Sequence, residues 1–331
     1  MIVDVHAHYV SPRLLDAVRA DPKTYGVGVV EGDAGPQLFF DGKAPIRAAV
    51  PPLLDLTRRR ERIAAQGVEL QVLSTWMELY GYQLPPEQGA RWSRLINQTM
   101  AADVGAPEHA EAFLAIANLP LQDGARAAEE LEYAVGELGM RGAMIAPNIF
   151  DRLLDDPDLD PLWRSAERLH AMIMVHPFAP DLGFRTRRYY LDNVLANPYD
   201  TTIAACSLIF GGVADRFPDL RILLVHGGGF FPYQVGRVQQ GYLVQEANRE
   251  HASRTPKEYL RWFQYDTMLL HPPAIRYLAD AVGVDEIVLG SDYPFPMSDG
   301  DPVESVRQSG LSPGEQTAVL QDNPRRLLRL P

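Results

Sequence analysis

The sequence has a single cysteine, Cys206, among its 331 residues. One thiol forms no internal disulfide, which excludes a disulfide-linked scaffold, and with no second cysteine nearby it gives no indication of a thiolate metal site. We expect a reducing compartment, the cytoplasm. No apolar stretch approaches the roughly 18 residues that span a bilayer, and the first residues lack the pattern of a secretory leader. Neither membrane insertion nor secretion is expected.

Positive charge is also scarce. Lysine and arginine number 31 against 43 aspartate and glutamate residues, which gives a net charge of −12. A nucleic-acid partner requires a basic face and is therefore not expected. The hydrophobic fraction of 46% is ordinary for a globular domain and allows a large core.

Short β-rich runs alternate with longer helical patterns along the chain, which is typical of parallel βα units. Eight runs are predicted as strands, and helices are predicted between and after them. The strands are residues 2–5, 69–74, 113–118, 142–146, 172–175, 221–225, 263–267 and 286–289. The helices are residues 91–104, 123–138, 160–170, 199–215, 232–247, 272–282 and 302–328, the last with a break near Ser312.

This order predicts an α/β fold, a (β/α)₈ TIM barrel formed by residues 1–331 as one domain. Residues 22–51, rich in glycine and proline, form an irregular insertion after the first strand, with a possible hairpin around Asp41 and Gly42. In this fold the active site lies at the C-terminal ends of the strands. Because the insertion follows the first strand, we expect it to cover the barrel mouth at that end.

Five ionisable side chains lie at four of the predicted strand ends. His6 and His8 end the first strand, and His176, His226 and Asp292 follow the fifth, sixth and eighth. A lone histidine here is often satisfied by the backbone, but strand ends of a barrel converge, so a joint site is favoured. Three nitrogens and a carboxylate suit Zn²⁺, or Mn²⁺ or Fe²⁺, and leave one of the five groups for acid/base work.

A single ion is expected, because no bridging group for a second one is evident. The three lysines, Lys23, Lys43 and Lys257, lie away from the strand ends, so none can become a carboxylated bridging lysine. The predicted fourth strand ends in Ala146, Pro147 and Asn148, which offers no carboxylate.

The four motifs that carry these groups resemble the amidohydrolase superfamily and, within it, the metal-dependent decarboxylases of the aminocarboxymuconate-semialdehyde type. The resemblance covers nearly the whole chain. The motifs are Asp-Val-His-Ala-His at residues 4–8, Val-His-Pro at 175–177, His-Gly-Gly-Gly at 226–229 and Leu-Gly-Ser-Asp-Tyr-Pro at 289–294. The resemblance implies that His6, His8, His176 and Asp292 bind the metal and that His226 is the catalytic acid/base.

The resemblance also implies two substrate-binding arginines, Arg47 in the insertion and Arg237, the latter reaching the neighbouring subunit's site in a homodimer. Guanidinium groups pair well with carboxylates, so a small carboxylate substrate is expected. Trp76 and Phe295, near strand ends, are further candidates for the substrate pocket, although ordinary barrel packing explains them nearly as well.

The resemblance predicts a carboxy-lyase that removes CO₂ without oxidation from a small unsaturated or aromatic acid. The ion would stabilise charge, and His226 would place a proton on the carbon that loses its carboxylate. The same groups also suit two alternatives, a hydrolase such as a lactonase or amidohydrolase, and a hydratase. In either of these, Asp292 would be both a metal ligand and a proton shuttle. A metal-holding scaffold without turnover is a third alternative.

Overall fold

The computed structural model describes residues 1–178, 180 and 182–331. Eight parallel strand positions form the predicted barrel, the third being divided into β5 and β6. They are β1 (Val3–Tyr9), β4 (Leu70–Thr75), β5 (Phe113–Ala115), β6 (Ala117–Asn118), β7 (Gly142–Ile145), β10 (Met172–Val175), β11 (Arg221–Leu224), β12 (Phe263–Asp266) and β13 (Ile287–Val288).

The strands fall into two hydrogen-bonded sheets, ordered β1-β4-β5 and β13-β12-β11-β10-β7-β6. Ile116 joins β5 to β6 and donates its N–H to the Leu73 carbonyl at 2.9 Å. At the other edge, β1 meets the chain just after β13, where Ala7 pairs in parallel with Tyr293 and the N–H of Val5 bonds to Leu289 at 2.9 Å. These contacts bring both sheets into one ring and confirm the predicted barrel class.

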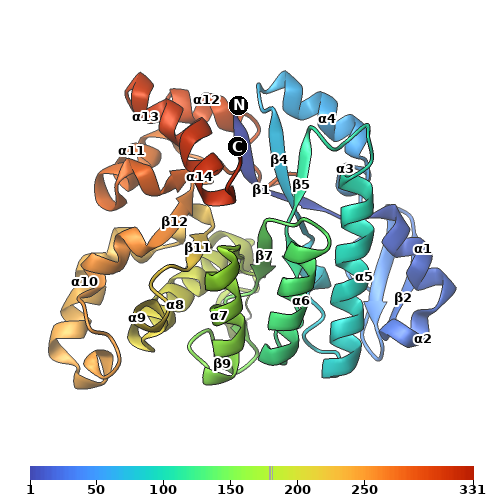
Figure 1. Cartoon of the computed structure of the whole chain (residues 1–331), viewed down its shortest axis with the longest axis horizontal. Helices are drawn as coiled ribbons and strands as arrows, with labels where there is room; N and C mark the ends of the chain where they lie inside the picture. Colours follow the sequence, from blue (N-terminus) through green and yellow to red (C-terminus); the bar gives the residue numbers. More distant parts are fainter. Residues whose placement is uncertain (179, 181) are drawn as a thin grey trace.

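Helices pack around the strands, as Figure 1 shows for the side that carries α5, α6 and α7. The principal ones are α1 (Pro12–Ala20), α4 (Leu56–Ala65), α5 (Pro86–Val104), α6 (Gly124–Gly136), α7 (Asp160–Leu169), α8 (Asn197–Phe210), α10 (Phe231–Val244) and α11 (Pro272–Val282). Shorter ones are α2 (Pro22–Tyr25), α3 (Pro51–Leu54), α9 (Val213–Arg216), α12 (Pro302–Arg307), α13 (Pro313–Thr317) and α14 (Asn323–Leu328).

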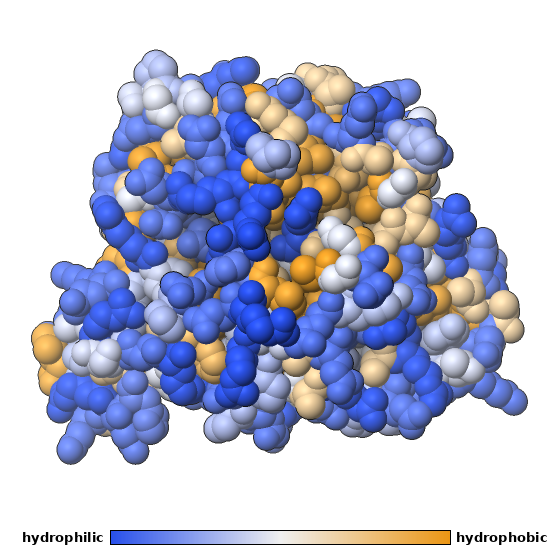
Figure 2. All heavy atoms as spheres, viewed as in Figure 1, coloured by the Kyte–Doolittle hydropathy of each residue, from blue (hydrophilic) through white to orange (hydrophobic). Residues whose placement is uncertain are grey.

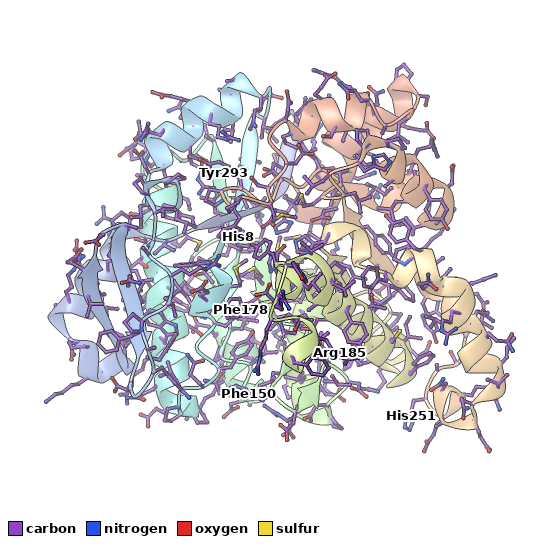
Figure 3. All side chains as sticks on the ribbon, turned by 180° about the vertical axis from the view of Figure 1, so that it is seen from behind. His8, Phe150, Phe178, Arg185, His251 and Tyr293 are labelled. Atoms are coloured by element: carbon purple, nitrogen blue, oxygen red, sulfur yellow. The ribbon has the colours of Figure 1, made fainter. Side chains whose placement is uncertain are left out.

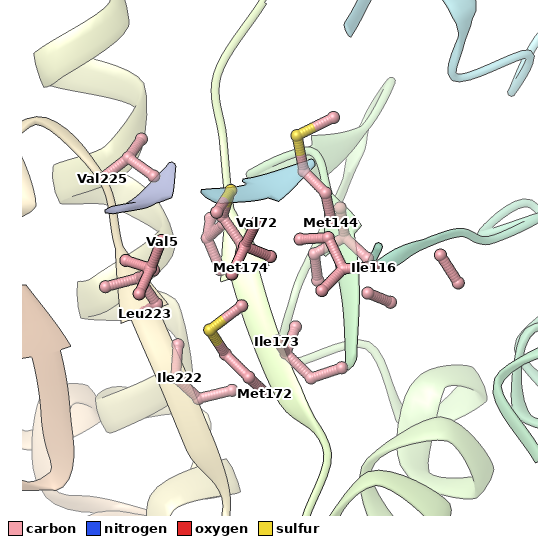
Figure 4. Packing of buried hydrophobic residues seen from close by; sticks show 14 of the residues in the cluster. Val5, Val72, Ile116, Met144, Met172, Ile173, Met174, Ile222, Leu223 and Val225 are labelled. Carbon is pink, nitrogen blue, oxygen red and sulfur yellow. The ribbon is translucent and has the colours of Figure 1, made fainter. Parts of the chain in front are cut away.

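The barrel interior is filled by apolar side chains from facing strands. Figure 4 shows Met172, Met174 and Leu223 packed with residues of β1, β4 and β7, and these three side chains are fully buried. Alternate residues of a strand point to opposite faces, and both faces are covered here, so the strands are apolar runs rather than alternating patterns. This packing holds the strand ends at fixed positions.

Residues 22–51 differ from the expected irregular insertion. They contain the hairpin of β2 (Val27–Gly32) and β3 (Gly35–Phe40), which lies beside α1 and α5 (Figure 1). The turn falls at residues 33–34, so the hairpin predicted around Asp41 and Gly42 was wrong. Val27, Leu38 and Phe40 are buried, and the Phe40 ring meets Trp92 of α5, which fixes the register.

One helix prediction also needed correction, and one helix was missed. The predicted helix over residues 199–215 is interrupted by Gly211 and Gly212, because Gly212 adopts a left-handed φ of 71° that ends α8 before α9 begins. Helix α1 was not predicted, although Ser11 caps it by accepting the N–H of Arg13. The predicted break near Ser312 is present, where Ser312 and Glu315 form a capping box that opens α13.

The surface is mostly hydrophilic on the face shown in Figure 2, with apolar atoms gathered over the region of β4 and β5. The two termini lie side by side (Figure 1), and the Met1 amino group donates to Gln321 at 3.3 Å. Among the described residues, none of the helices has the length and apolar character needed to cross a bilayer.

Candidate metal centre and active site

The predicted site residues meet at the C-terminal ends of four strands. His6 and His8 lie on β1, while His176, His226 and Asp292 follow β10, β11 and β13. The His6, His8 and His176 side chains and Asp292 are buried, and His226 is partly exposed to the cavity. Figure 3 shows His8 in the middle of the molecule, between Tyr293 and Phe178.

The Asp292 carboxylate is the common contact of the four imidazoles. Its Oδ1 atom lies 3.0 Å from His8 Nε2, 3.4 Å from His6 Nε2 and 3.7 Å from His176 Nε2. Its Oδ2 atom lies 3.6 Å from His226 Nε2. The structure therefore brings together all five groups that the sequence placed at the strand ends.

A hydrogen-bond acceptor lies at the Nδ1 atom of three of the histidines. For His6, His8 and His176 in turn, the acceptors are Asp266 Oδ2 at 2.7 Å, the Thr75 carbonyl at 3.0 Å and the Pro177 carbonyl at 2.7 Å. Such an acceptor selects the tautomer that carries its proton on Nδ1 and leaves the Nε2 lone pair free. Asp266 in turn accepts the N–H of Gly227 at 2.9 Å, which ties β12 to the loop of His226.

The donor set fits a divalent metal ion. The Nε2 atoms of His6 and His176 are buried and have no hydrogen-bond partner among the described residues. Burying such a nitrogen without a partner costs free energy, unless a bound ion or another group interacts with its lone pair. Ligand atoms of His6, His176, His226 and Asp292 all lie within 4.8 Å of one another. The sequence-based ligand set differs from this group only in having His8 in place of His226.

The charge states of the site follow from burial and from the two carboxylates. Burial lowers the pKa of His6, but the hydrogen bond to Asp266 and the nearby Asp292 carboxylate outweigh burial and raise the pKa to about 10. Burial lowers the pKa of His8, and it lowers that of His176 to about 3. Burial alone would raise the pKa of Asp292, yet the close contacts with the histidines hold it well below 3.8. In the metal-free site Asp292 is thus a carboxylate, and His8 and His176 are neutral.

A cavity of about 460 Å³ opens above these groups and is large enough for a single-ring acid. His176, His226 and Asp292 form part of its wall. Phe295 also lines it, with its ring 5.0 Å from that of His8. Arg47 lines the same cavity from the segment before α3.

The remaining predicted residues lie farther from the cavity. Trp76 is buried and does not line the cavity; its ring supports the Arg47 guanidinium, 5.5 Å from the ring centroid. Arg237 is exposed on α10 and does not line the cavity of its own chain. Its predicted role depends on a second subunit.

Sequence reasoning missed Glu78, which lines the cavity and pairs with Arg47 through both the side chain and the backbone N–H. Its position just after β4, at a strand end, was an available signal. It also missed Asp192 and Asn193, which line the cavity from the segment that precedes α8. Their sequence separation from any strand end gave no signal.

Fold and site together define a metal-binding (β/α)₈ barrel whose ligands lie at the C-terminal ends of the strands. The chain belongs to the amidohydrolase family, because the family model described as "Amidohydrolase" matches residues 3–330. This confirms the resemblance found in the sequence.

A curated relative from Dictyostelium discoideum, 2-amino-3-carboxymuconate-6-semialdehyde decarboxylase, is 31% identical over 283 residues. That alignment covers 82% of this chain and 76% of the relative. Its name agrees with the reaction class predicted from the sequence, that of a carboxy-lyase.

Two solved structures share the fold. The 5-carboxyvanillate decarboxylase LigW from Sphingomonas paucimobilis superposes with a TM-score of 0.83 at 23% identity, over 100% of this chain and 99% of its own. A dihydroxybenzoic acid decarboxylase from Polaromonas sp. JS666 was solved with manganese and the inhibitor 2-nitroresorcinol. It superposes with a TM-score of 0.79 at 22% identity, over 99% of this chain and 97% of its own.

Proposed function

We propose that this protein is a metal-dependent, non-oxidative decarboxylase of a small aromatic or unsaturated carboxylic acid. The observation that carries the proposal is the convergence of buried histidine Nε2 atoms on Asp292, beside a cavity that also holds His226 and Arg47. An ion position, an acid/base group and a carboxylate-binding group therefore share one cavity.

His6, His8, His176 and Asp292 would hold one divalent ion. Three imidazole nitrogens with one carboxylate oxygen favour Zn²⁺, and Mn²⁺ and Fe²⁺ are the alternatives. When bound, the ion supplies positive charge that stabilises negative charge developing on a substrate oxygen. Asp266 keeps His6 in the required tautomer through the 2.7 Å bond to Nδ1.

His226 is the proposed acid/base group. When the bond to the carboxylate carbon breaks, CO₂ leaves and the electron pair stays on the substrate carbon. His226 gives its Nε2 proton to that carbon and regains a proton from solvent. Asp292 Oδ2 lies 3.6 Å from Nε2 and orients the imidazole.

Arg47 is the proposed anchor for a substrate carboxylate. Its guanidinium lies over Trp76 and pairs with Glu78, so it is held at the cavity wall before substrate binds. Through this contact Trp76 supports substrate binding indirectly, while Phe295 contributes the apolar wall that receives a ring or double bond.

Residues 22–51 are proposed as a cover of the barrel mouth, because Pro45, Ile46 and Arg47 near the end of this segment line the cavity. The hairpin itself packs outside against α1, and its Phe40 ring contacts Trp92 of α5. Residues 1–331 are taken as one domain. The cytoplasm is the proposed location, since the lone Cys206 needs no oxidising compartment.

A homodimer is proposed in which Arg237 of one subunit reaches the active site of the other. Arg237 is exposed on α10, and the exposed apolar side chains Leu243 and Val244 lie near the end of the same helix. Apolar side chains that gather on an exposed helix favour an interface.

The direct test is release of CO₂ by metal-loaded protein from a panel of muconate semialdehydes and hydroxybenzoates, with lactones as the hydrolysis control. Decarboxylation predicts CO₂ with at least one acid. Lactone opening or hydration without CO₂ release would replace this proposal by the hydrolase or hydratase alternative.

A further inference from the structure

Asn193 lies where two cavities of the active site meet. A second cavity of about 310 Å³ adjoins the central one, and Asn193 lines both, together with His226 and Asp292. A substrate that fills the central cavity beside His226 therefore meets a wall to which Asn193 contributes. The mechanism above assigns this residue no role.

The backbone around Asn193 is irregular. Tyr189 and Tyr190 have left-handed φ values of 61° and 58°, and a π-helical turn (Asp192–Ala196) follows before α8 begins. Such φ values are uncommon for residues with bulky side chains, and π-helical turns occur frequently at functional sites. Asp192 and Asn193, the first two residues of this turn, both line the central cavity.

The side-chain amide of Asn193 is available to a ligand. Its atoms are accessible, and among the described residues they have no hydrogen-bond partner. The backbone N–H of the same residue bonds to the Tyr190 carbonyl at 3.1 Å and to Asp192 Oδ1 at 3.0 Å, so the turn does not need the amide to hold it. A primary amide both donates and accepts hydrogen bonds, which makes it a versatile binding group on a cavity wall.

Asp192 places a second polar group on this wall. Its Oδ1 atom accepts the backbone N–H of Asn193, and this bond restrains the carboxylate at the start of the turn. A carboxylate only accepts hydrogen bonds, and the amide oxygen of Asn193 accepts as well. The two side chains therefore match a ligand group that donates a hydrogen bond, such as a hydroxyl or an amine.

We propose that Asp192 and Asn193 bind a hydrogen-bond donor of the substrate, a hydroxyl or amino group, while Arg47 holds a carboxylate in the same cavity. The inference rests on the proposed function and narrows its substrate class to acids that carry such a donor in addition to the groups that meet the metal. Asp192 and Asn193 are thereby specificity-determining residues.

The test uses calorimetric binding to zinc-loaded protein, which does not require turnover. The probes are hydroxybenzoate, aminobenzoate and methylbenzoate, each with its substituent at the 3- or the 4-position. The three substituents are similar in size, but the methyl group donates no hydrogen bond. Wild type should bind the best hydroxyl or amino isomer about tenfold more tightly than its methyl counterpart, as a hydrogen bond to a charged acceptor predicts.

Two variants separate the contributions to this preference. Asn193→Leu keeps the size of the side chain and removes its hydrogen bonds, whereas Asp192→Asn removes the charge and keeps an oxygen for the Asn193 N–H. Each should lower the preference at least threefold and leave methylbenzoate affinity within about twofold. Asn248→Leu, in the short helix Glu246–Arg249, is the matched control, because Asn248 lines neither cavity, and it should keep the wild-type preference.

The inference is overturned if wild type binds the hydroxyl, amino and methyl probes equally, or if the preference persists undiminished in Asn193→Leu or in Asp192→Asn. A variant that loses affinity for all probes by the same factor keeps its preference and counts against the inference in the same way. Failure of every benzoate to bind the zinc-loaded wild type would instead overturn the proposed function. The two failures are therefore distinguishable.

Discussion

The histidines of the site meet at one carboxylate but differ in pKa, because their other neighbours differ. His6 contacts two carboxylates, Asp266 and Asp292, which raise its pKa to about 10 against the effect of burial. His176 donates to a backbone carbonyl, and burial lowers its pKa to about 3. The pKa of the same side chain thus depends on its immediate partners.

At the residue scale, the first prediction concerns His226. His226→Ala should retain the metal, because four other ligands remain, and should lower kcat by roughly 10²–10⁴-fold through loss of the proton donor. Metal content and CO₂ release measure the two effects separately. His251→Ala, at an exposed position far from the site (Figure 3), is the matched control and should behave as wild type. A variant that keeps near-normal kcat would refute the role.

Asp200 gives a prediction of pH dependence. Burial raises the pKa of this carboxyl from 3.8 to about 6, despite two contacts with the Asn148 amide. The folded state therefore binds the proton more tightly than the unfolded state, so the charged form destabilises the fold above pH 6, and stability is regained as pH falls from about 6 toward 4.

Asp200→Asn should accordingly stabilise the protein at pH 8 by about 1–3 kcal/mol and have little effect near pH 4. Denaturant unfolding at the two pH values measures the difference, with the exposed Asp41→Asn as control. Equal effects of Asp200→Asn at both pH values would show that the carboxyl does not titrate in this range.

At the scale of elements, the strands were predictable because both faces of each are buried, which leaves short apolar runs between turn residues. The five groups of the site were predictable for the same reason, since His176, His226 and Asp292 end such runs. Folding of the barrel brings these strand ends together in one place.

Contacts between residues distant in the chain were not predictable in this way. Glu78 meets Arg47 across 31 residues, and Tyr233 stacks on Tyr277 across two helices. The hairpin at β2 and β3 was misplaced because Asp41 and Gly42 look like a turn, whereas the burial of Leu38 and Phe40 against the barrel decides the register.

Helix α4 and strand β1 are joined by a buried arginine, which gives an element-scale prediction. Arg59 is fully buried and donates to the backbone carbonyls of His8 at 2.6 Å and Pro52 at 2.9 Å, and to Gln71 at 3.2 Å. Arg59→Met leaves these acceptors unpaired and should cost about 3 kcal/mol of stability.

The same change should weaken metal binding, because Arg59 holds the backbone of His8. Unfolding by denaturant and metal titration measure the two consequences. Arg60→Met is the control, since Arg60 is exposed and its one recorded hydrogen bond is to a surface carbonyl. Stability and metal affinity like those of the control would contradict the positioning role.

At the scale of the whole molecule, the proposed homodimer predicts complementation between inactive variants. Arg237→Ala and His226→Ala should each be inactive alone. In an equal mixture that exchanges subunits, half of the dimers are mixed, and each mixed dimer has one complete site, so activity should return to about a quarter of wild type. Activity measured before and after exchange tests this; no recovery in mixed dimers would contradict a shared site.

The central claim is that residues between positions 6 and 292 hold one divalent ion that the reaction requires. The most direct measurement is metal content and CO₂ release on the same preparation, first as purified, then after chelation, then after adding back Zn²⁺, Mn²⁺ or Fe²⁺. The account predicts about one ion per chain, loss of activity on chelation and recovery on addition. Full activity in protein stripped of metal, or protein that takes up no ion from any of the three solutions, would contradict it.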